Sequence, residues 1–331
     1  MNVLTVDADE YRQLQGELGG ATRLTLYDDV RLVVVRFARP DEVAGLAVPA
    51  TLTAVVAATG PGAGAAAFAD VILATPPEVQ AVTDVVARAP VAASSFAVLL
   101  RAGQSEPGHS DRSVAAGLTL ESATYSMLQG AAEFASWRAT RPARAGDEPG
   151  PRVRLERDGD VLRVTLTRPH KRNALDSAMR DQLVDALEVA LAEPSLRVEL
   201  RGEGAAFCAG GDLDEFGSRT DIAFAHLVRL TRSPASLLHE LRERTVSYLH
   251  GACLGSGIEM PAFGGTIIAA PDTVIGLPEI SLGLIPGAGG TVSLPRRIGR
   301  QRTAYLGLTG RTVNAATALS WGLVDRIKTT D

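Results

Sequence analysis

The sequence predicts an α/β protein, and three observations lead to this prediction. Short apolar runs rich in β-branched residues alternate with segments of helical spacing along the 331 residues. Glycine-rich turns follow two of these runs, one beginning at Gly60 and the other at Gly251. Between the two turns, from Glu78 to Ala139, valines, leucines and aromatic residues recur at helical spacing. We therefore expect a small α/β unit, a helical segment and a larger α/β unit, in that order.

The first unit is predicted to span residues 1–76. Its expected elements are a helix at 9–18, strands at 23–27, 31–37, 53–58 and 70–74, and a short helix after Pro40. Gly60, Gly62 and Gly64 would suit a dinucleotide-binding turn. That turn also needs a further glycine and an acidic residue that closes the next strand, and the sequence supplies neither convincingly.

An internal repeat explains these glycines better. The stretch GPGAGAAAFADVILATP, which begins at Gly60, aligns without a gap with GSGIEMPAFGGTIIAAP, which begins at Gly255. The alignment places Gly64 where the second copy has Glu259. We therefore interpret residues 1–76 as a shortened, degenerate copy of the larger unit, and we expect a structural unit without a second active site.

Residues 77–142 are predicted to form the helical segment, which is interrupted by a polar loop at 103–112. Residues 143–151 are rich in proline, glycine and charge and are predicted to be a linker. The larger unit then covers residues 152–331. Its expected elements are strands at 153–155, 161–166, 196–200, 246–249 and 266–270, and helices at 179–191, 220–243, 302–308 and 315–321.

Two glutamates of the larger unit follow strands and stand among apolar residues. Glu259 lies just inside the helix that follows the turn GACLGSG, and Glu279 lies in the turn after the strand at 266–270. A carboxylate among apolar neighbours is costly unless it is paired or its proton affinity is raised for use. A lone glutamate at a helix start is most often a dipole partner. Two glutamates in one apolar pocket, however, can divide general-acid and general-base work on a water molecule.

Several motifs of the larger unit occur in the order found in the crotonase superfamily, the enoyl-CoA hydratases and isomerases. FCAGGDLDEF, GSGIEM and LPEISLGLIPGAGGT resemble that family over residues 152–327. The resemblance implies a crotonase-like ββα spiral core. It also implies that the amides of Gly211 and Ser256 form an oxyanion hole for a thioester carbonyl. The catalytic pair of a hydratase would then be Glu259 and Glu279.

The turn RPHKRNALD resembles the acyl-CoA-binding loop of the same family. The resemblance implies that this turn and the CAGG motif bind the coenzyme A part of the substrate, with no separate cofactor. The implied residues are Lys171, Arg172, Ala174, Ala209 and Gly210. Without the downstream motifs, an exposed basic turn before a helix capped by Asp176 would be the favoured interpretation.

The order of the segments departs from that family. The helices of residues 77–142, which include ESATYSMLQGAAEFASW, resemble the segment that normally follows a crotonase core, whereas here they precede it. We infer a rearranged order in which the packing partners still meet in space. The family commonly forms trimers or pairs of trimers, with this segment at subunit contacts. The resemblance therefore implies a homo-oligomer, with trimer, hexamer and dimer all open.

Composition argues against several classes of function. The formal charge of −5 favours neither nucleic acid nor an anionic membrane as a partner, and no apolar run reaches the length of a membrane span. The N-terminus has neither the basic region nor the apolar core of a secretory signal, so a cytoplasmic location is expected. Cys208 and Cys253 are too few for a metal cluster and are interpreted as packing residues of a reducing compartment.

Other polar residues near these motifs receive structural interpretations. Asp212 is expected to cap the following helix, with Asp214 and Glu215 in its first turn. His226 and His239 are expected to be structural or surface residues, because neither lies beside a carboxylate or serine motif.

The sequence therefore predicts hydration of a 2-enoyl-CoA thioester to a 3-hydroxyacyl-CoA, or the reverse, as in fatty acid metabolism. Two alternatives remain open. An enoyl-CoA delta-isomerase needs only one base, and a non-catalytic acyl-CoA-binding subunit is suggested by the rearranged order and the degenerate first unit. Pro261, two residues after Glu259, fits only in a first helical turn and indicates an unusual acyl pocket.

Overall fold

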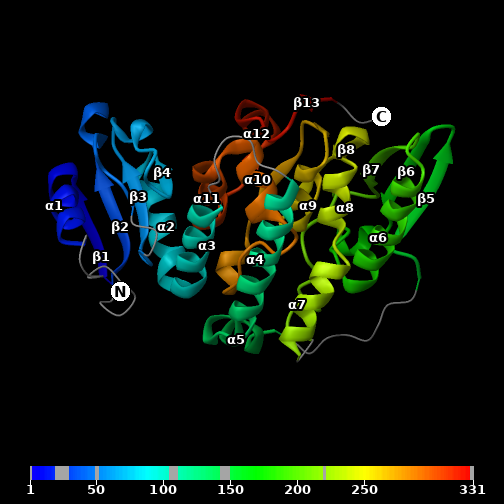
Figure 1. Ribbon diagram of the computed structural model, residues 1–331, viewed down its shortest axis with the longest axis horizontal. Coiled ribbons are helices and arrows are strands. Elements are labelled where there is room, and N and C mark those ends of the chain that lie inside the picture. The colour runs from blue at the N-terminus through cyan, green and yellow to red at the C-terminus, as the bar shows by residue number, and fades with distance from the viewer. Residues whose placement is uncertain are drawn as a thin grey trace.

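The computed structural model describes residues 2–18, 30–48, 52–103, 111–141, 150–218 and 221–328. A small sheet lies at one end of the molecule and a six-stranded sheet at the other, and a layer of helices lies between them (Figure 1). The predicted α/β class is confirmed. The strand predicted at 23–27 and nearly all of the predicted linker lie outside the described residues.

The small sheet consists of four parallel strands in chain order. They are β1 (Asn2–Asp7), β2 (Val30–Arg36), β3 (Val55–Thr59) and β4 (Val71–Leu73). β-Branched residues dominate them, as is typical of parallel strands that are buried on both faces. Val33 and Val35 pack in a cluster with Tyr11 of helix α1 (Ala8–Leu18), while Leu32 and Val34 belong to a cluster shared with the helical layer. The short helix expected after Pro40 is a 3-10 helix at Pro40–Val43.

Four helices form the layer between the sheets. They are α2 (Pro76–Arg88), α3 (Pro90–Ala102), α4 (Asp111–Gln129) and α5 (Ala132–Ala139). The carboxylate of Glu78 accepts from the amides of Ala74 and Thr75 at the start of α2. Among the described residues, no single helix has the length and apolarity of a membrane span. Only α2 and α3 together meet that criterion, and they are bent by 112°.

The larger sheet has the order β13-β10-β8-β7-β6-β5. Its strands are β5 (Val153–Asp158), β6 (Val161–Leu166), β7 (Arg197–Gly202), β8 (Thr245–Leu249), β10 (Thr266–Ala269) and β13 (Arg326–Ile327). A hairpin joins β5 and β6 in antiparallel pairing, and Gly159 has a φ of 60° in its turn. A second sheet has the order β12-β11-β9, from β9 (Ala252–Leu254), β11 (Val274–Gly276) and β12 (Val313–Asn314).

The helices of the larger unit are α6 (Ser177–Ala192), α7 (Ile222–Thr231), α8 (Pro234–Glu240), α9 (Ser256–Glu259), α10 (Gly290–Ile298), α11 (Arg300–Thr309) and α12 (Ala315–Trp321). The helices predicted at 179–191, 302–308 and 315–321 correspond to α6, α11 and α12, whereas α10 was not predicted. The single helix expected at 220–243 is divided, because Ser233 caps a new helix and Pro234 begins it. Asp176 caps α6 by accepting from the amide of Met179.

The interpretation of Asp212 as a helix cap is wrong. The next helix, α7, is capped by Asp221 instead. Asp212 is buried, and its carboxylate accepts from the guanidinium of Arg168 at 2.6 Å. Its other oxygen accepts from the amide of Asp214 at 3.0 Å, so Asp212 closes a turn and forms a buried ion pair but does not cap a helix.

The two sheets share a topology. Strands β1, β2, β3 and β4 are parallel and adjacent in chain order, as are β6, β7, β8 and β10 in the larger sheet. The units differ after the third strand, where β9 and α9 are inserted between β8 and β10. In the first unit, by contrast, β3 is followed directly by the glycine turn and β4. This arrangement is compatible with a degenerate repeat, which stays a prediction.

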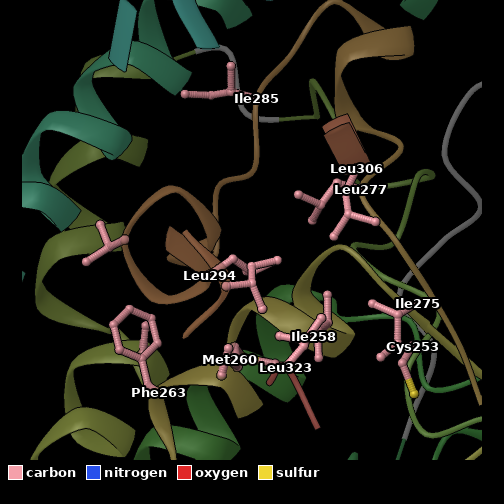
Figure 2. Packing of buried hydrophobic residues seen from close by; sticks show 14 of the residues in the cluster. Cys253, Ile258, Met260, Phe263, Ile275, Leu277, Ile285, Leu294, Leu306 and Leu323 are labelled. Carbon is pink, nitrogen blue, oxygen red and sulfur yellow. The ribbon is translucent and has the colours of Figure 1, made fainter. Parts of the chain in front are cut away.

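One buried cluster extends from the small sheet through the helical layer into the larger unit. Figure 2 shows part of it, where Ile258 and Met260 lie among buried residues that include Leu294 and Leu323. The three parts of the chain therefore share one buried hydrophobic cluster, and a second cluster lies within the small unit.

A buried ion cluster joins the same three parts. Asp70, after β3, is 1% exposed, and its carboxylate accepts from Arg101 of α3 and from Arg300 of α11. The amide of Val56 on β3 donates to the same carboxylate at 2.8 Å. The small unit is thus attached to the rest of the molecule by charge as well as by apolar contact.

Candidate active site

Paired strands bring the two predicted glutamates together. β9 and β11 run parallel with Leu254 opposite Gly276, so the turns that follow them begin side by side. Glu259 ends the short helix α9, and Glu279 begins a 3-10 helix at Glu279–Leu282. Pro261 begins a further 3-10 helix, where a missing backbone donor costs nothing, as its position required.

Gly255 lies between the two carboxyl groups. Its φ of 49° and ψ of −122° are disfavoured for residues with a side chain. A Cβ at this position would stand 2.2 Å from Oε1 of Glu279 and 3.6 Å from Oε1 of Glu259. The glycine therefore leaves room for both carboxyl groups to approach the same point, and any substitution would displace Glu279.

The loop that precedes α10 holds the carboxylate of Glu259. Oε2 of Glu259 accepts from the amide of Ala288 at 2.8 Å and from that of Gly290 at 2.9 Å. A Cβ on residue 290 would lie 2.6 Å from Cγ of Glu259, so this glycine is needed for the contact. The amides of the PGAGG motif therefore orient the buried carboxylate of Glu259.

A third carboxylate, which the sequence did not single out, comes from the helical layer. Glu121 of α4 is 2% exposed and accepts from the amides of Gly289 and Thr291 at 2.7 and 2.8 Å. The hydroxyl of Thr291 donates to it at 2.6 Å. Four successive amides, from residue 288 to residue 291, therefore alternate between Glu259 and Glu121. The signal in the sequence was an acid within a helical run of mainly apolar and small residues, ESATYSML.

Burial dominates the electrostatics of these three acids. It raises the pKa of Glu279 from its ordinary value of 4.5 to about 8, and it raises the pKa of Glu121 to about 7. The pKa of Glu259 lies well above its usual range because of burial and the neighbouring charges of Glu279 and Glu121. Oε2 of Glu279 is buried and has no hydrogen-bond partner among the described residues. The cluster thus retains protons near neutral pH, as acid–base work requires.

Glu279→Gln is expected to stabilise the fold at alkaline pH. The wild-type folded state binds the Glu279 proton more tightly than the unfolded chain does, so wild-type stability falls as pH rises from about 4.5 to about 8. Glutamine does not ionise, so the advantage of the variant should grow across this window, to a few kcal/mol at most. Urea unfolding at pH 5, 7 and 9 measures it, with exposed Glu188→Gln on α6 as the control. If the difference in unfolding free energy between Glu279→Gln and the wild type does not change with pH, the expectation is wrong.

The two predicted amide donors border the same site. Gly211 forms a parallel bridge with Leu175, and Ser256 is the first residue of α9, where amides have no partner inside the helix. Neither amide donates to an acceptor within the described part of the chain. The ring of Phe216 lies where a Cβ of residue 211 would stand, at 2.5 Å, which explains the glycine.

A cavity of about 280 Å³ connects these groups. Glu259, Glu279, Gly211 and Ser256 all line it, so the structure brings the four predicted residues together. The helical layer and α7 supply further walls. Their lining residues are Tyr125, Gln129, Phe224, Ala225, Val228 and Arg229.

The residues predicted to bind coenzyme A do not line this cavity but lie next to it. Lys171 pairs with Asp214 at 2.8 Å, and Arg172 is exposed with a φ of 51°. The carbonyl of Arg172 accepts from the amide of Ala209, and that of Gly210 accepts from Leu175, which does line the cavity. Ala174 follows in the same turn, and its carbonyl accepts from Arg168. The two predicted segments are therefore joined by backbone hydrogen bonds.

The remaining predicted residues have structural contacts. His226 and Ser122 share a hydrogen bond of 2.9 Å, and the ring of His239 packs edge-on against Phe263. Cys208 and Cys253 are fully buried and free. In the described ranges, no group of three or more histidine, cysteine, aspartate or glutamate side chains is arranged to hold a metal ion.

Comparisons with known proteins show which family the larger unit is similar to. A model of the enoyl-CoA hydratase/isomerase family matches residues 156–331. Mevalonyl-coenzyme A hydratase SIDH of Beauveria bassiana is 38% identical over 176 residues, which are 50% of this chain and 63% of that protein. The 2,3-dehydroadipyl-CoA hydratase of Escherichia coli is 35% identical over 178 residues, or 54% of this chain and 69% of that protein.

A solved structure is similar over the same part of the chain. The enoyl-CoA hydratase from Thermoplasma volcanium aligns with a TM-score of 0.50 and 35% identity, over 55% of this chain and 73% of that one. The chain thus spans somewhat less than two thirds of the length of the Beauveria bassiana protein. It spans more than two thirds of the Escherichia coli and Thermoplasma volcanium proteins. The similarity concerns the larger unit.

Proposed function

This chain belongs to the enoyl-CoA hydratase/isomerase family, and we propose from that premise that it adds water to the 2,3-double bond of an enoyl-CoA thioester, or removes it. One observation carries the proposal. The carboxyl groups of Glu259 and Glu279 and the residues of the two unpaired amides, Gly211 and Ser256, border one cavity. Water addition to a conjugated thioester needs an acid, a base and a site for developing negative charge.

In the proposed reaction the amides of Gly211 and Ser256 donate to the thioester carbonyl oxygen. Bonding of water to C3 moves negative charge onto this oxygen as an enolate. Each donor already in place lowers the barrier by about 2.7–4 kcal/mol in comparable oxyanion holes. Because the amides belong to a bridge and to a helix start, their orientation is fixed before substrate binds.

Glu259 and Glu279 divide the proton transfers. One takes a proton from the water whose oxygen bonds to C3, and the other gives a proton to C2, so the elements of water add completely. Glu279 lines the cavity in which the water would bind, and the amides of Ala288 and Gly290 orient Glu259. The raised pKa values keep a proton on the coupled pair near neutral pH.

Family membership also supports a site for the coenzyme A moiety beside the cavity. We propose that it follows the surface formed by Lys171, Arg172, Ala174, Ala209 and Gly210. The homo-oligomeric state and the cytoplasmic location stay predictions.

A panel of thioesters tests the function. The wild-type protein is expected to convert a 2-enoyl-CoA into the 3-hydroxyacyl-CoA, with kcat of about 1–1000 s⁻¹, followed by loss of the conjugated thioester absorbance and by mass spectrometry. Conversion of 3-enoyl-CoA to 2-enoyl-CoA without hydration would instead identify an isomerase. Tight binding of every thioester without turnover would identify a binding subunit, and either outcome would refute the proposal.

A further inference from the structure

The cavity wall carries a guanidinium that has no carboxylate partner among the residues that the structure describes. Arg229 of α7 is partly buried, and its Nε donates to the hydroxyl of Ser122 at 3.0 Å. A terminal nitrogen donates to the hydroxyl of Ser126 and to the carbonyl of Ser122. The guanidinium also lies over the ring of Tyr125, 4.8 Å from its centroid. These contacts position the cation but leave its charge without a counterion.

Four other arginines with buried side chains are paired with acids, whereas half-buried Arg244 donates to the carbonyls of Ala190, Glu193 and Leu196. Arg101 and Arg300 share Asp70, while Arg152 pairs with Asp176 and Arg168 with Asp212. Burying a cation costs several kcal/mol, and these carboxylates offset that cost. Within the described residues, Arg229 forms no such pair, and burial lowers its pKa. An anion bound from outside the chain would give Arg229 the counterion that the paired arginines have.

The acids near Arg229 are engaged elsewhere. Glu121 interacts with it through space but forms no ion pair with it, because Glu121 accepts from Gly289 and Thr291. The amides of Ala288 and Gly290 orient Glu259, and Glu279 has a free oxygen whose proton affinity is raised. The chain therefore supplies hydrogen-bond acceptors to this guanidinium but no counterion.

Two further groups make the same wall suitable for an anion. Arg180 of α6 lines the cavity, and it pairs with its neighbour Asp181, whose side chain is 44% exposed. Oε1 of Gln129 is buried without a partner among the described residues. A carboxamide can rotate to present its NH₂ group to a carboxylate. Two cations and the carboxamide of Gln129 thus border a cavity whose lining also includes apolar residues and the acids Asp176, Glu215, Glu259 and Glu279.

We propose that the acyl group of the substrate carries a second carboxylate, at the end of the chain remote from the thioester, and that this carboxylate pairs with Arg229. The inference rests on the proposed function and names its substrate class, the CoA thioesters of unsaturated dicarboxylic acids. Guanidinium and carboxylate groups match in geometry and form two parallel hydrogen bonds. The apolar walls accommodate the intervening carbons, and Arg180 adds to the positive potential.

Matched thioesters test this inference. Pairs of six- and eight-carbon 2-enoyl-CoA esters that end in either a methyl group or a carboxylate are compared by kcat/KM. The wild-type protein is expected to prefer the carboxylate member by at least tenfold. In Arg229→Gln, kcat/KM for that member should fall about a hundredfold, because a buried charge loses its partner, while the methyl-ended ester changes by about threefold or less. Arg229→Lys, which keeps the charge, should restore part of the preference.

Arg232→Gln is the matched control. Arg232 follows Arg229 by three positions, pairs with Asp181 and Asp185, and does not line the cavity. Its replacement is expected to leave the ratio of the two kcat/KM values unchanged. Thermal unfolding of each variant shows whether the fold is retained.

Binding separates a failure of this inference from a failure of the proposed function. Dissociation constants are measured by calorimetry for saturated acyl-CoA esters with either end group, which cannot react. If methyl-ended 2-enoyl esters are hydrated as well as carboxylate-ended ones, or if Arg229→Gln weakens both equally, the inference is wrong and the hydratase proposal stands. If no ester is hydrated, the hydratase proposal fails. A wild-type binding preference for the carboxylate that Arg229→Gln removes would then still support the inference, and its absence would overturn it.

Discussion

Glu259→Gln and Glu279→Gln are each expected to lower the hydration rate by about two to four orders of magnitude. Glutamine has nearly the shape of glutamate but neither takes nor gives a proton in this reaction. Each variant therefore removes one proton transfer while leaving the cavity and the amides of Gly211 and Ser256 in place. The loss should appear in kcat, measured with a saturating 2-enoyl-CoA, since the lost interaction acts in the transition state.

The control for this pair is Glu133→Gln. Glu133 of α5 also accepts from two backbone amides, those of Val91 and Ala92, but it lies outside the cavity lining. Its replacement should leave kcat unchanged. Both catalytic-site variants should still bind a saturated acyl-CoA as tightly as the wild type. Unaltered kcat in either of them would refute the division of proton transfers between two acids.

Asp70→Ala is expected to lower the free energy of unfolding by about 3–5 kcal/mol. The change removes the shared partner of Arg101 and Arg300 and leaves two cations in a region where Asp70 is 1% exposed. It also removes the acceptor for the amide of Val56. Because the three segments joined by Asp70 are remote in sequence, the loss should affect the attachment of the small unit to the core first.

Urea unfolding measures this effect, and Asp160→Ala provides the comparison. Asp160 pairs with Arg197 at 3.0 Å, but both side chains are mostly exposed, so little change is expected there. A loss in Asp70→Ala no larger than that in Asp160→Ala would show that the buried cluster contributes nothing to stability.

The sequence revealed the parts of the site that depend on local pattern. Glu259 and Glu279 were recognised because each stands among apolar residues after a strand, and the parallel pairing of β9 and β11 brings such positions together. The glycines at 255 and 290 were recognised as turn residues. Their actual role, which is to leave room for the glutamate side chains, depends on contacts between turns that periodicity does not show.

The parts that the sequence did not reveal come from packing between remote segments. Glu121 and Arg229 lie on helices whose spacing predicts only a buried face. Which side chain meets the catalytic loop depends on how α4 and α7 dock. The error at Asp212 has the same origin, because Arg168, 44 residues earlier, could not be identified as its partner from spacing alone. The positions of these side chains are thus determined by contacts between remote segments, which local sequence patterns do not show.

The alternating amides from Ala288 to Thr291 have a consequence for how the protein matures. Glu121 is synthesised long before the loop that it binds. During that time its carboxylate lacks the amides of Gly289 and Thr291 as partners. Only after residues 288–291 emerge can both acids be seated, and until then the orientation of Glu259 is incomplete. Glu259 therefore gains its two amide contacts only after residues 288–291 have been made, and Glu121 of α4 binds the same loop.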